Sequence, residues 1–183
     1  VKSEGGELIV TNLKLTGAEK GSVRLYAPDS AAPVKATFEH VEFKENQNYE
    51  SAQKQGGAFV AYSDTEITFK DCNFTGNSAH WGGAGAVYGC TLTLENTFFK
   101  GNTGIHGGGS LSINDGAAVE IKGKLEAEAE DDSVDDSAVL VAFNSGTVTV
   151  DETATSSSGA VLSLCGMPSV DCSSSNSAED DSG

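Results

Sequence analysis

The chain is poor in basic residues, and this shortage argues against two classes of partner. Its 183 residues include 11 Lys and Arg against 27 Asp and Glu, which gives a formal net charge of −16. Nucleic acids and anionic membrane surfaces are bound chiefly through basic side chains, so the sequence predicts that neither is a partner. We expect a protein or a surface glycan instead.

Long apolar runs and Pro are also scarce. No run of about 18 apolar residues occurs, so we expect no segment that spans a bilayer. Only three Pro accompany 22 Gly, a balance typical of short strands joined by tight turns. The four Cys are compatible with an extracytoplasmic compartment. Because the chain begins at Val1 and not at Met, we expect a processed protein or an excised fragment.

The sequence does contain an internal repeat of about 25 residues. Each copy runs from a Gly-Gly pair through two alternating apolar segments to a Phe-x-x-Asn motif. The first Gly of each pair is Gly56, Gly82 or Gly107, at intervals of 26 and 25 residues, and Phe74 and Phe99 are 25 residues apart. A fixed period of this size predicts stacked copies of one supersecondary unit.

The alternation within each repeat predicts the fold class. Short runs with a period of two indicate β-strands, and three runs per repeat predict an all-β protein, a right-handed parallel β-helix of about six coils. We place one β-helix domain over residues 1–172, with its clearest repeats in 34–114. Residues 173–183 are Ser-rich and acidic, and we expect a flexible tail there.

Alignment of the repeats predicts columns of inward side chains that exclude water along the axis. The first column contains Phe38, Phe69, Leu94, Ile121 and Val150. The second contains Phe43, Phe74, Phe99 and Leu125, and the third contains Tyr62, Tyr88 and Ile113. Asn46, Asn77 and Asn102 recur after the Phe strands, where stacked Asn side chains can bond to one another and to the backbone of a turn. We expect structural roles for these Asn residues and for the Gly-Gly pairs.

The two motifs together resemble the polymorphic outer membrane protein repeats of chlamydial surface adhesins. The Gly-Gly motifs are Gly56-Gly57-Ala58, Gly82-Gly83-Ala84 and Gly107-Gly108-Gly109. The Phe-x-x-Asn motifs run from Phe43 to Asn46, from Phe74 to Asn77 and from Phe99 to Asn102. The resemblance covers about 43–114, and the third Gly-Gly pair lacks its Ala. It implies a parallel β-helix of the autotransporter passenger type with an adhesive role.

The negative charge is concentrated near the C-terminus. Lys124 is the last basic residue, and 13 of the acidic residues follow it. A candidate Ca²⁺ site consists of Glu130, Asp131, Asp132, Asp135 and Asp136, because clustered carboxylates supply the oxygens that this ion prefers. Their spacing is not that of an EF-hand, so a solvated acidic loop is the simpler interpretation. A docking face for a basic partner is a third, and we expect no other cofactor.

A second candidate site contains His80, Trp81 and His106. In register, Trp81 stacks over His106 at the turn before a Gly-Gly pair, and His80 is adjacent. Exposed aromatic and imidazole rings suit contacts with a sugar or a protein. Packing at a corner is the simpler interpretation, and no third metal ligand falls at the matching position.

The cysteines fall into two groups. Cys165 and Cys172 bracket a six-residue loop, and we expect a local disulfide between them. Cys72 is in phase with Val41 and Thr97, which predicts a buried thiol.

Three functions compete for such a fold. We expect a non-enzymatic structural or adhesive module outside the cytoplasm, whether secreted, on the cell surface or in an organelle lumen. An accessory scaffold subunit docked on a larger complex, including a lumen-facing membrane complex, is the alternative.

A carbohydrate-active enzyme is a third possibility, since polysaccharide lyases and hydrolases also use β-helices. The single Arg of the chain, Arg24, lies on a terminal coil, and hydrolysis needs paired carboxylates at a defined separation. Asp64, Asp71 and Glu95 form no such pair in the repeat pattern, so we expect no catalysis.

Overall fold

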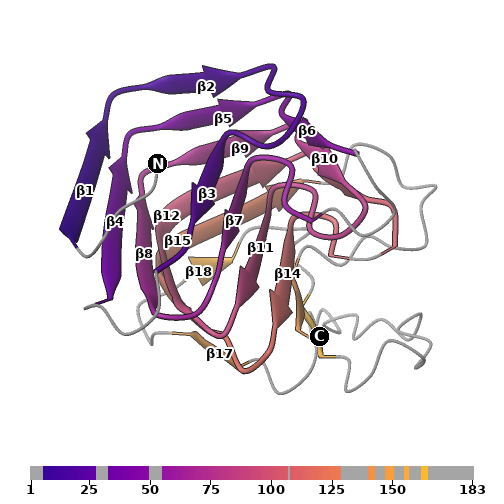
Figure 1. Ribbon diagram of the computed structural model, residues 1–183. Coiled ribbons are helices and arrows are strands. Elements are labelled where there is room, and N and C mark those ends of the chain that lie inside the picture. The colour runs from indigo at the N-terminus through magenta and orange to yellow at the C-terminus, as the bar shows by residue number, and fades with distance from the viewer. Residues whose placement is uncertain are drawn as a thin grey trace.

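The computed structural model describes residues 6–27, 33–49, 55–106, 108–128, 140–142, 147–150, 155–156 and 162–164. These residues form β-strands and turns, with no helix among them, and the strands stack in parallel as a β-solenoid (Figure 1). The predicted fold class, an all-β parallel β-helix, is confirmed. The tail at 173–183 lies outside the described residues, so the domain boundary stays a prediction.

Three parallel sheets form the walls. The largest has two consecutive faces. The first face contains β1 (Gly6–Thr11), β4 (Val34–Glu39), β8 (Thr65–Lys70) and β17 (Thr147–Val150). The second face contains β2 (Lys14–Thr16), β5 (Glu42–Lys44), β9 (Asn73–Thr75) and β18 (Thr155–Ser156). The long strands β12 (Thr91–Lys100) and β15 (Ala118–Glu128) run through both faces.

The other two sheets are made of shorter strands. The small sheet contains β6 (Gln47–Asn48), β10 (Ser78–Ala79) and β13 (Thr103–Gly104). The third contains β3 (Val23–Leu25), β7 (Phe59–Ala61), β11 (Gly85–Tyr88), β14 (Leu111–Asn114), β16 (Leu140–Ala142) and β19 (Leu162–Leu164).

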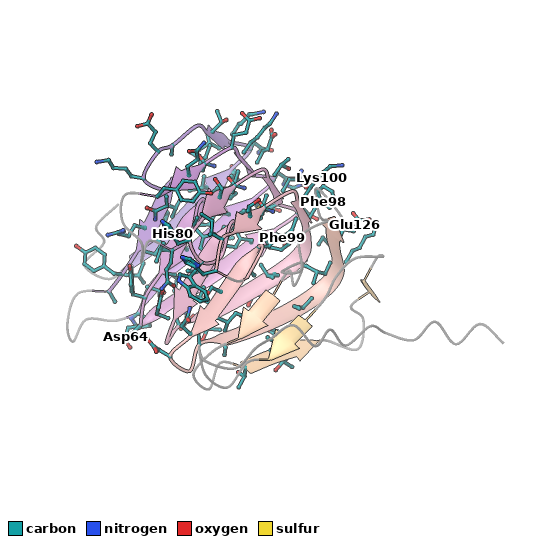
Figure 2. The ribbon with its side chains drawn as sticks, turned by 90° about the vertical axis from the view of Figure 1, so that its right-hand side faces the viewer. Asp64, His80, Phe98, Phe99, Lys100 and Glu126 are labelled. Carbon is teal, nitrogen blue, oxygen red and sulfur yellow. The ribbon has the colours of Figure 1, made fainter. Side chains whose placement is uncertain are left out.

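The number of coils differs slightly from the prediction. Strands β1, β4, β8, β12 and β15 lie side by side in this order, so residues 6–128 make about four turns instead of the predicted six coils. Figure 2 shows the same stack from the side. The later strands β16 to β19 pair onto the same sheets.

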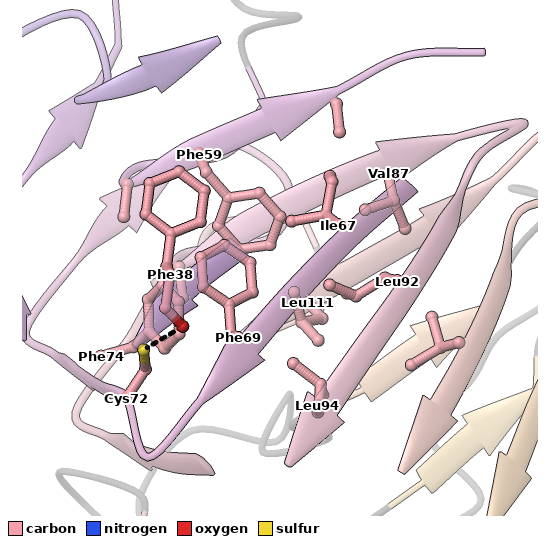
Figure 3. Close-up of a cluster of buried hydrophobic side chains, with 14 of the residues drawn as sticks. Phe38, Phe59, Ile67, Phe69, Cys72, Phe74, Val87, Leu92, Leu94 and Leu111 are labelled. Carbon is pink, nitrogen blue, oxygen red and sulfur yellow. Dashed lines mark hydrogen bonds between the residues drawn. The ribbon is translucent and has the colours of Figure 1, made fainter. Parts of the chain in front are cut away.

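The first predicted column is confirmed. Phe38 pairs with Phe69, Phe69 with Leu94, and Leu94 with Ile121, and the backbone of Ile121 pairs with that of Val150. The rings of Phe38 and Phe69 stack with centroids 5.1 Å apart, and both side chains are fully buried (Figure 3). Large-to-small changes at such positions typically destabilise a fold by about 3–5 kcal/mol for Phe→Ala.

The second column is confirmed except for its last member. Phe43, Phe74 and Phe99 stack with centroids 4.6 and 5.0 Å apart. Leu125, however, pairs with Thr97, and Ala127 lies opposite Phe99. The reason is a β-bulge: two residues of β15 lie opposite one residue of β12 between the pairs Glu95–Lys122 and Thr97–Leu125.

The third column was predicted in the wrong register. Ile113 pairs with Val87, whereas Tyr62 and Tyr88 lie one position further along and stack on the outer side, where Tyr62 is 37% exposed. The inward positions include Phe59, whose ring occupies the space beside Gly85: a Cβ there would lie 2.1 Å from Cε1 of Phe59. The outward displacement of the tyrosines leaves the interior to smaller aliphatic side chains and to Phe59.

The Phe-x-x-Asn motif has a clear structural role. Nδ2 of Asn77 donates to the carbonyl oxygen of Phe43 in the preceding coil at 2.9 Å and to Oδ1 of Asn102 in the following coil at 2.9 Å. Nδ2 of Asn46 likewise donates to Leu15 O and to Oδ1 of Asn77. The predicted Asn ladder is confirmed, and it satisfies buried polar groups at the corner.

The Gly-Gly pairs allow neighbouring coils to approach closely. Gly82 has a φ of +61°, and a Cβ on Gly83 would lie 2.3 Å from the carbonyl oxygen of Gly109. The backbone bond from Gly83 N to Gly109 O, at 3.0 Å, places the third copy of the pair at Gly108-Gly109, one residue later than predicted. Only a residue without a Cβ fits this approach.

Candidate aromatic surface site

The predicted binding residues lie together at the corner that follows the small sheet. Tyr49 follows β6, His80 and Trp81 follow β10, and Ile105 and His106 follow β13. We call these five residues the aromatic patch. The backbone pairing continues past the short strands, because Ile105 N donates to Ala79 O at 3.1 Å and His106 N donates to His80 O at 2.8 Å.

The rings of the aromatic patch form a ladder across three coils. His80 and His106 stack with centroids 5.4 Å apart and an interplanar angle of 18°. Trp81 meets His106 at 5.5 Å with a tilt of 47°, so the predicted contact between Trp81 and His106 is present, although the parallel stack is made by His80. Tyr49 meets His80 edge-on at 5.5 Å.

The aromatic patch is partly open to solvent. Ile105 is 51% exposed and Tyr49 is 38% exposed, while His80 and Trp81 are half-buried. Nδ1 of His80 is buried and has no hydrogen-bond partner among the described protein atoms. Apolar ring surfaces beside imidazole nitrogens can contact both the apolar face and the hydroxyl groups of a sugar, or the side chains of a peptide.

Sequence reasoning missed two members of the aromatic patch. Tyr49 and Ile105 follow directly after Asn48 and Gly104, which pair with Ala79. Alignment on the Phe-x-x-Asn motif places Tyr49 and Ile105 level with His80, and this signal was present in the sequence. It was hidden because the second coil has a longer loop between its Asn and Gly-Gly motifs.

Comparison of the chain with family models, curated proteins and solved structures found no match. The resemblance to the chlamydial repeats therefore stays a prediction. Among the described residues, there is no helix of the length and apolar character needed to cross a membrane.

Of the three carboxylates considered for catalysis, Asp71 and Glu95 lie on neighbouring coils, where Asp71 N donates to Glu95 O at 2.9 Å. Asp64 forms the corner before β8, and Asp71 forms the corner between β8 and β9, both with positive φ. Glu95, on β12, forms an ion pair with Lys70 at 3.7 Å. In Figure 2, Asp64 lies at the lower left of the view, away from Lys100 and Glu126 at the right.

Two predicted sites fall outside the described residues. These are the candidate Ca²⁺ ligands Glu130, Asp131, Asp132, Asp135 and Asp136, and the candidate disulfide between Cys165 and Cys172. Both stay predictions.

Cys72 is a free, buried thiol, as predicted. Its Sγ donates to the carbonyl oxygens of Phe38 at 3.3 Å (Figure 3) and of Lys70 at 3.2 Å. Burial raises the pKa of the Cys72 thiol to about 11. Cys90 is also free and buried, and burial raises its thiol pKa as well. Raised pKa values make these thiols poor nucleophiles at neutral pH, because the thiolate is the reactive form.

Proposed function

We propose that this chain is a non-enzymatic structural or adhesive β-solenoid module, exposed outside the cytoplasm, that contacts a protein or a glycan through the aromatic patch. The observation that carries the proposal is the partly exposed ring ladder of Tyr49, His80 and His106 beside Trp81. Aromatic side chains of this kind dominate the energetics of many recognition surfaces.

The position of the rings on the solenoid favours binding. The backbones of Ile105 and His106 are hydrogen-bonded to the preceding coil, and the rings of His80, Trp81 and His106 hold one another in place. A surface that is already ordered loses less conformational entropy when a partner binds. The resemblance to chlamydial adhesin repeats supports the same role.

A binding experiment with one substitution tests this function. The purified chain is measured against immobilised oligosaccharides and against proteins from the surfaces that it meets in its source. Trp81→Ala should weaken binding at least tenfold, because it removes a large ring from the patch. Tyr62→Ala is the matched control, since Tyr62 is a stacked, partly exposed aromatic that directly follows β7, a strand of another sheet. Equal binding by the wild type and by Trp81→Ala would show that the aromatic patch is not the surface that binds the partner.

A second function, that of an accessory subunit docked on a larger assembly, is favoured by the N-terminal end of the solenoid. Strands β1, β2 and β3 are edge strands. Within the described residues, no strand pairs with their outer backbone edges (Figure 1). Ile9 is 61% exposed and Leu13 is 45% exposed at this end. Exposed edges with apolar side chains are ready templates for pairing with another chain.

Mild purification of the native protein from its source distinguishes the two functions. A docked subunit should travel with a stoichiometric partner, whereas an adhesive module should run alone. Ile9→Lys should release the partner if the N-terminal end is the docking surface. Thr37→Lys is the control, because Thr37 pairs with Ile9 on the next strand and is half-buried on the same outer face. A partner with a basic face that survives Ile9→Lys would instead favour docking at the acidic C-terminal segment.

A further inference from the structure

Three potential metal ligands meet at a different corner of the solenoid. Glu39 is the last residue of β4, His40 forms the corner that leads to β5, and Asp71 forms the equivalent corner in the next coil. We call Glu39, His40 and Asp71 the corner triad. Two of its members are 31 residues apart in sequence and are brought together by the parallel stacking of β4 on β8.

The imidazole of His40 lies between the two carboxylates. Its Nδ1 is 3.9 Å from Oε1 of Glu39, and its Nε2 is 3.9 Å from Oδ2 of Asp71. One nitrogen and one oxygen from each carboxylate lie within 4.8 Å of one another. One ion can take only one of the two His40 nitrogens, so only one of these 3.9 Å distances belongs to a ligand set. Bonds of about 2.0–2.2 Å to a tetrahedral zinc ion place ligand atoms roughly 3.4 Å apart, so the side chains must rotate to bring the three atoms closer by up to roughly 1.4 Å. The side chains are exposed enough to make such rotations.

The backbone that carries the corner triad is fixed. His40 N donates to Lys70 O at 3.1 Å, and Asp71 N donates to Glu95 O at 2.9 Å. The next residue after Asp71 is the buried Cys72, which anchors the corner to the core. A rigid backbone beneath rotatable side chains keeps the ligands near one another before any ion arrives, which lowers the entropy lost on binding.

Backbone conformation explains part of the residue choice at this corner. His40 and Asp71 have φ values of +54° and +50°, and the equivalent corners of other coils use Asn12 and Asn96 at +53° and +49°. Asn, Asp and His are the residues that tolerate this region best. An Asn would satisfy the backbone equally well in all four coils. The corners that have His40 and Asp71 instead of Asn are also the two beside Glu39, which supplies a third ligand atom.

We propose that the corner triad binds a divalent transition metal ion of the zinc type, with solvent completing the coordination. Imidazole with carboxylates suits Zn²⁺ and its neighbours, whereas Ca²⁺ prefers six to eight oxygens. The net charge of −16 favours cations over anions near the surface. The site is separate from the aromatic patch and does not rest on the function proposed for that patch. It would link two consecutive coils by a metal bridge.

Zinc titration of the full chain and three variants tests the proposal. His40→Asn and Asp71→Asn remove ligands and place at each corner the residue that equivalent corners already use, so both variants should fold. Asp64→Asn is the matched control, because Asp64 is another corner aspartate with a φ of +61°. We expect His40→Asn and Asp71→Asn each to weaken Zn²⁺ binding at least tenfold and Asp64→Asn to leave it unchanged.

Imidazole NMR signals provide the second readout, because the chain has only three histidines, His40, His80 and His106. Zn²⁺ should shift the signals of His40, and a hundredfold excess of Ca²⁺ should not reverse the shift. Any one of the following results would overturn the proposal: wild-type affinity in His40→Asn, a response confined to His80 and His106, or displacement of the bound Zn²⁺ by Ca²⁺. The last result would place the ion among oxygen ligands alone. Absence of any Zn²⁺ binding by the wild type would overturn it as well.

Discussion

Substitution of Asn77 tests whether the Asn ladder stabilises the solenoid. Asn77 is fully buried and makes four hydrogen bonds through its side chain. Its Oδ1 accepts from the backbone N and from Nδ2 of Asn46 at 3.1 and 2.9 Å. Its Nδ2 donates to Phe43 O and to Oδ1 of Asn102, each at 2.9 Å. Asn77→Ala removes these four bonds from the interior.

The magnitude follows from the number of bonds lost. A buried hydrogen bond contributes about 0.5–1.5 kcal/mol net, and a buried group left unpaired adds a desolvation penalty. Four lost bonds therefore predict a decrease of about 2–6 kcal/mol in the free energy of unfolding. For a chain of this size, such a loss corresponds to a fall in Tm of roughly 10 °C.

Chemical denaturation followed by circular dichroism measures the effect. Asn73→Ala is the control, since Asn73 is exposed on β9 and its substitution should change stability by less than about 0.5 kcal/mol. Asn77→Asp keeps the shape but replaces the two N–H donors by a carboxylate that faces two oxygens, so it should destabilise at least as strongly. If Asn77→Ala and Asn73→Ala were equally stable, the reasoning about the ladder would be refuted.

Two further substitutions test the close approach of the coils and the buried thiol. Gly83→Ala should decrease the free energy of unfolding by at least about 3 kcal/mol, because its Cβ would lie 2.3 Å from a backbone oxygen of the next coil. Gly76→Ala is the control. It should cost only roughly 1–2 kcal/mol, because Gly76 has a φ of +62° but the atom nearest to the added Cβ lies 3.7 Å away. Equal denaturation midpoints for Gly83→Ala and Gly76→Ala would contradict this expectation. The free energy of unfolding should also fall as pH rises from about 9 to about 11. The unfolded chain loses the Cys72 proton near the ordinary thiol pKa of 9.0, whereas the folded chain keeps it until about 11. Between these values ionisation favours the unfolded chain. Cys72→Thr introduces the residue that the equivalent position of the next coil, Thr97, already has. It should reduce the slope of this pH profile and leave the part that comes from Cys90, whose thiol pKa is also raised by burial. An unchanged slope would assign the dependence to other groups.

The sequence by itself determined the architecture. Successive coils have the same residue types at equivalent positions. The repeat of about 25 residues and the period-two alternation therefore predicted parallel strands, and the structure confirms them. The Phe columns and the Asn ladder were predictable for the same reason: strands in register place Phe43 on Phe74 and Asn46 beside Asn77. The position of Trp81 over His106 followed from the same alignment.

Only the tertiary structure decided the places where the coils stop being equivalent. The bulge in β15 removes Leu125 from the Phe column. On the third face, alternation alone did not determine which residues point inward, and the structure places Tyr62 on the outer side. A shift by one residue reverses the direction of every side chain in a strand, which makes such errors invisible in the sequence pattern. The approach of His40 to Asp71 likewise depends on side-chain directions at a corner, which the period of the repeat does not specify.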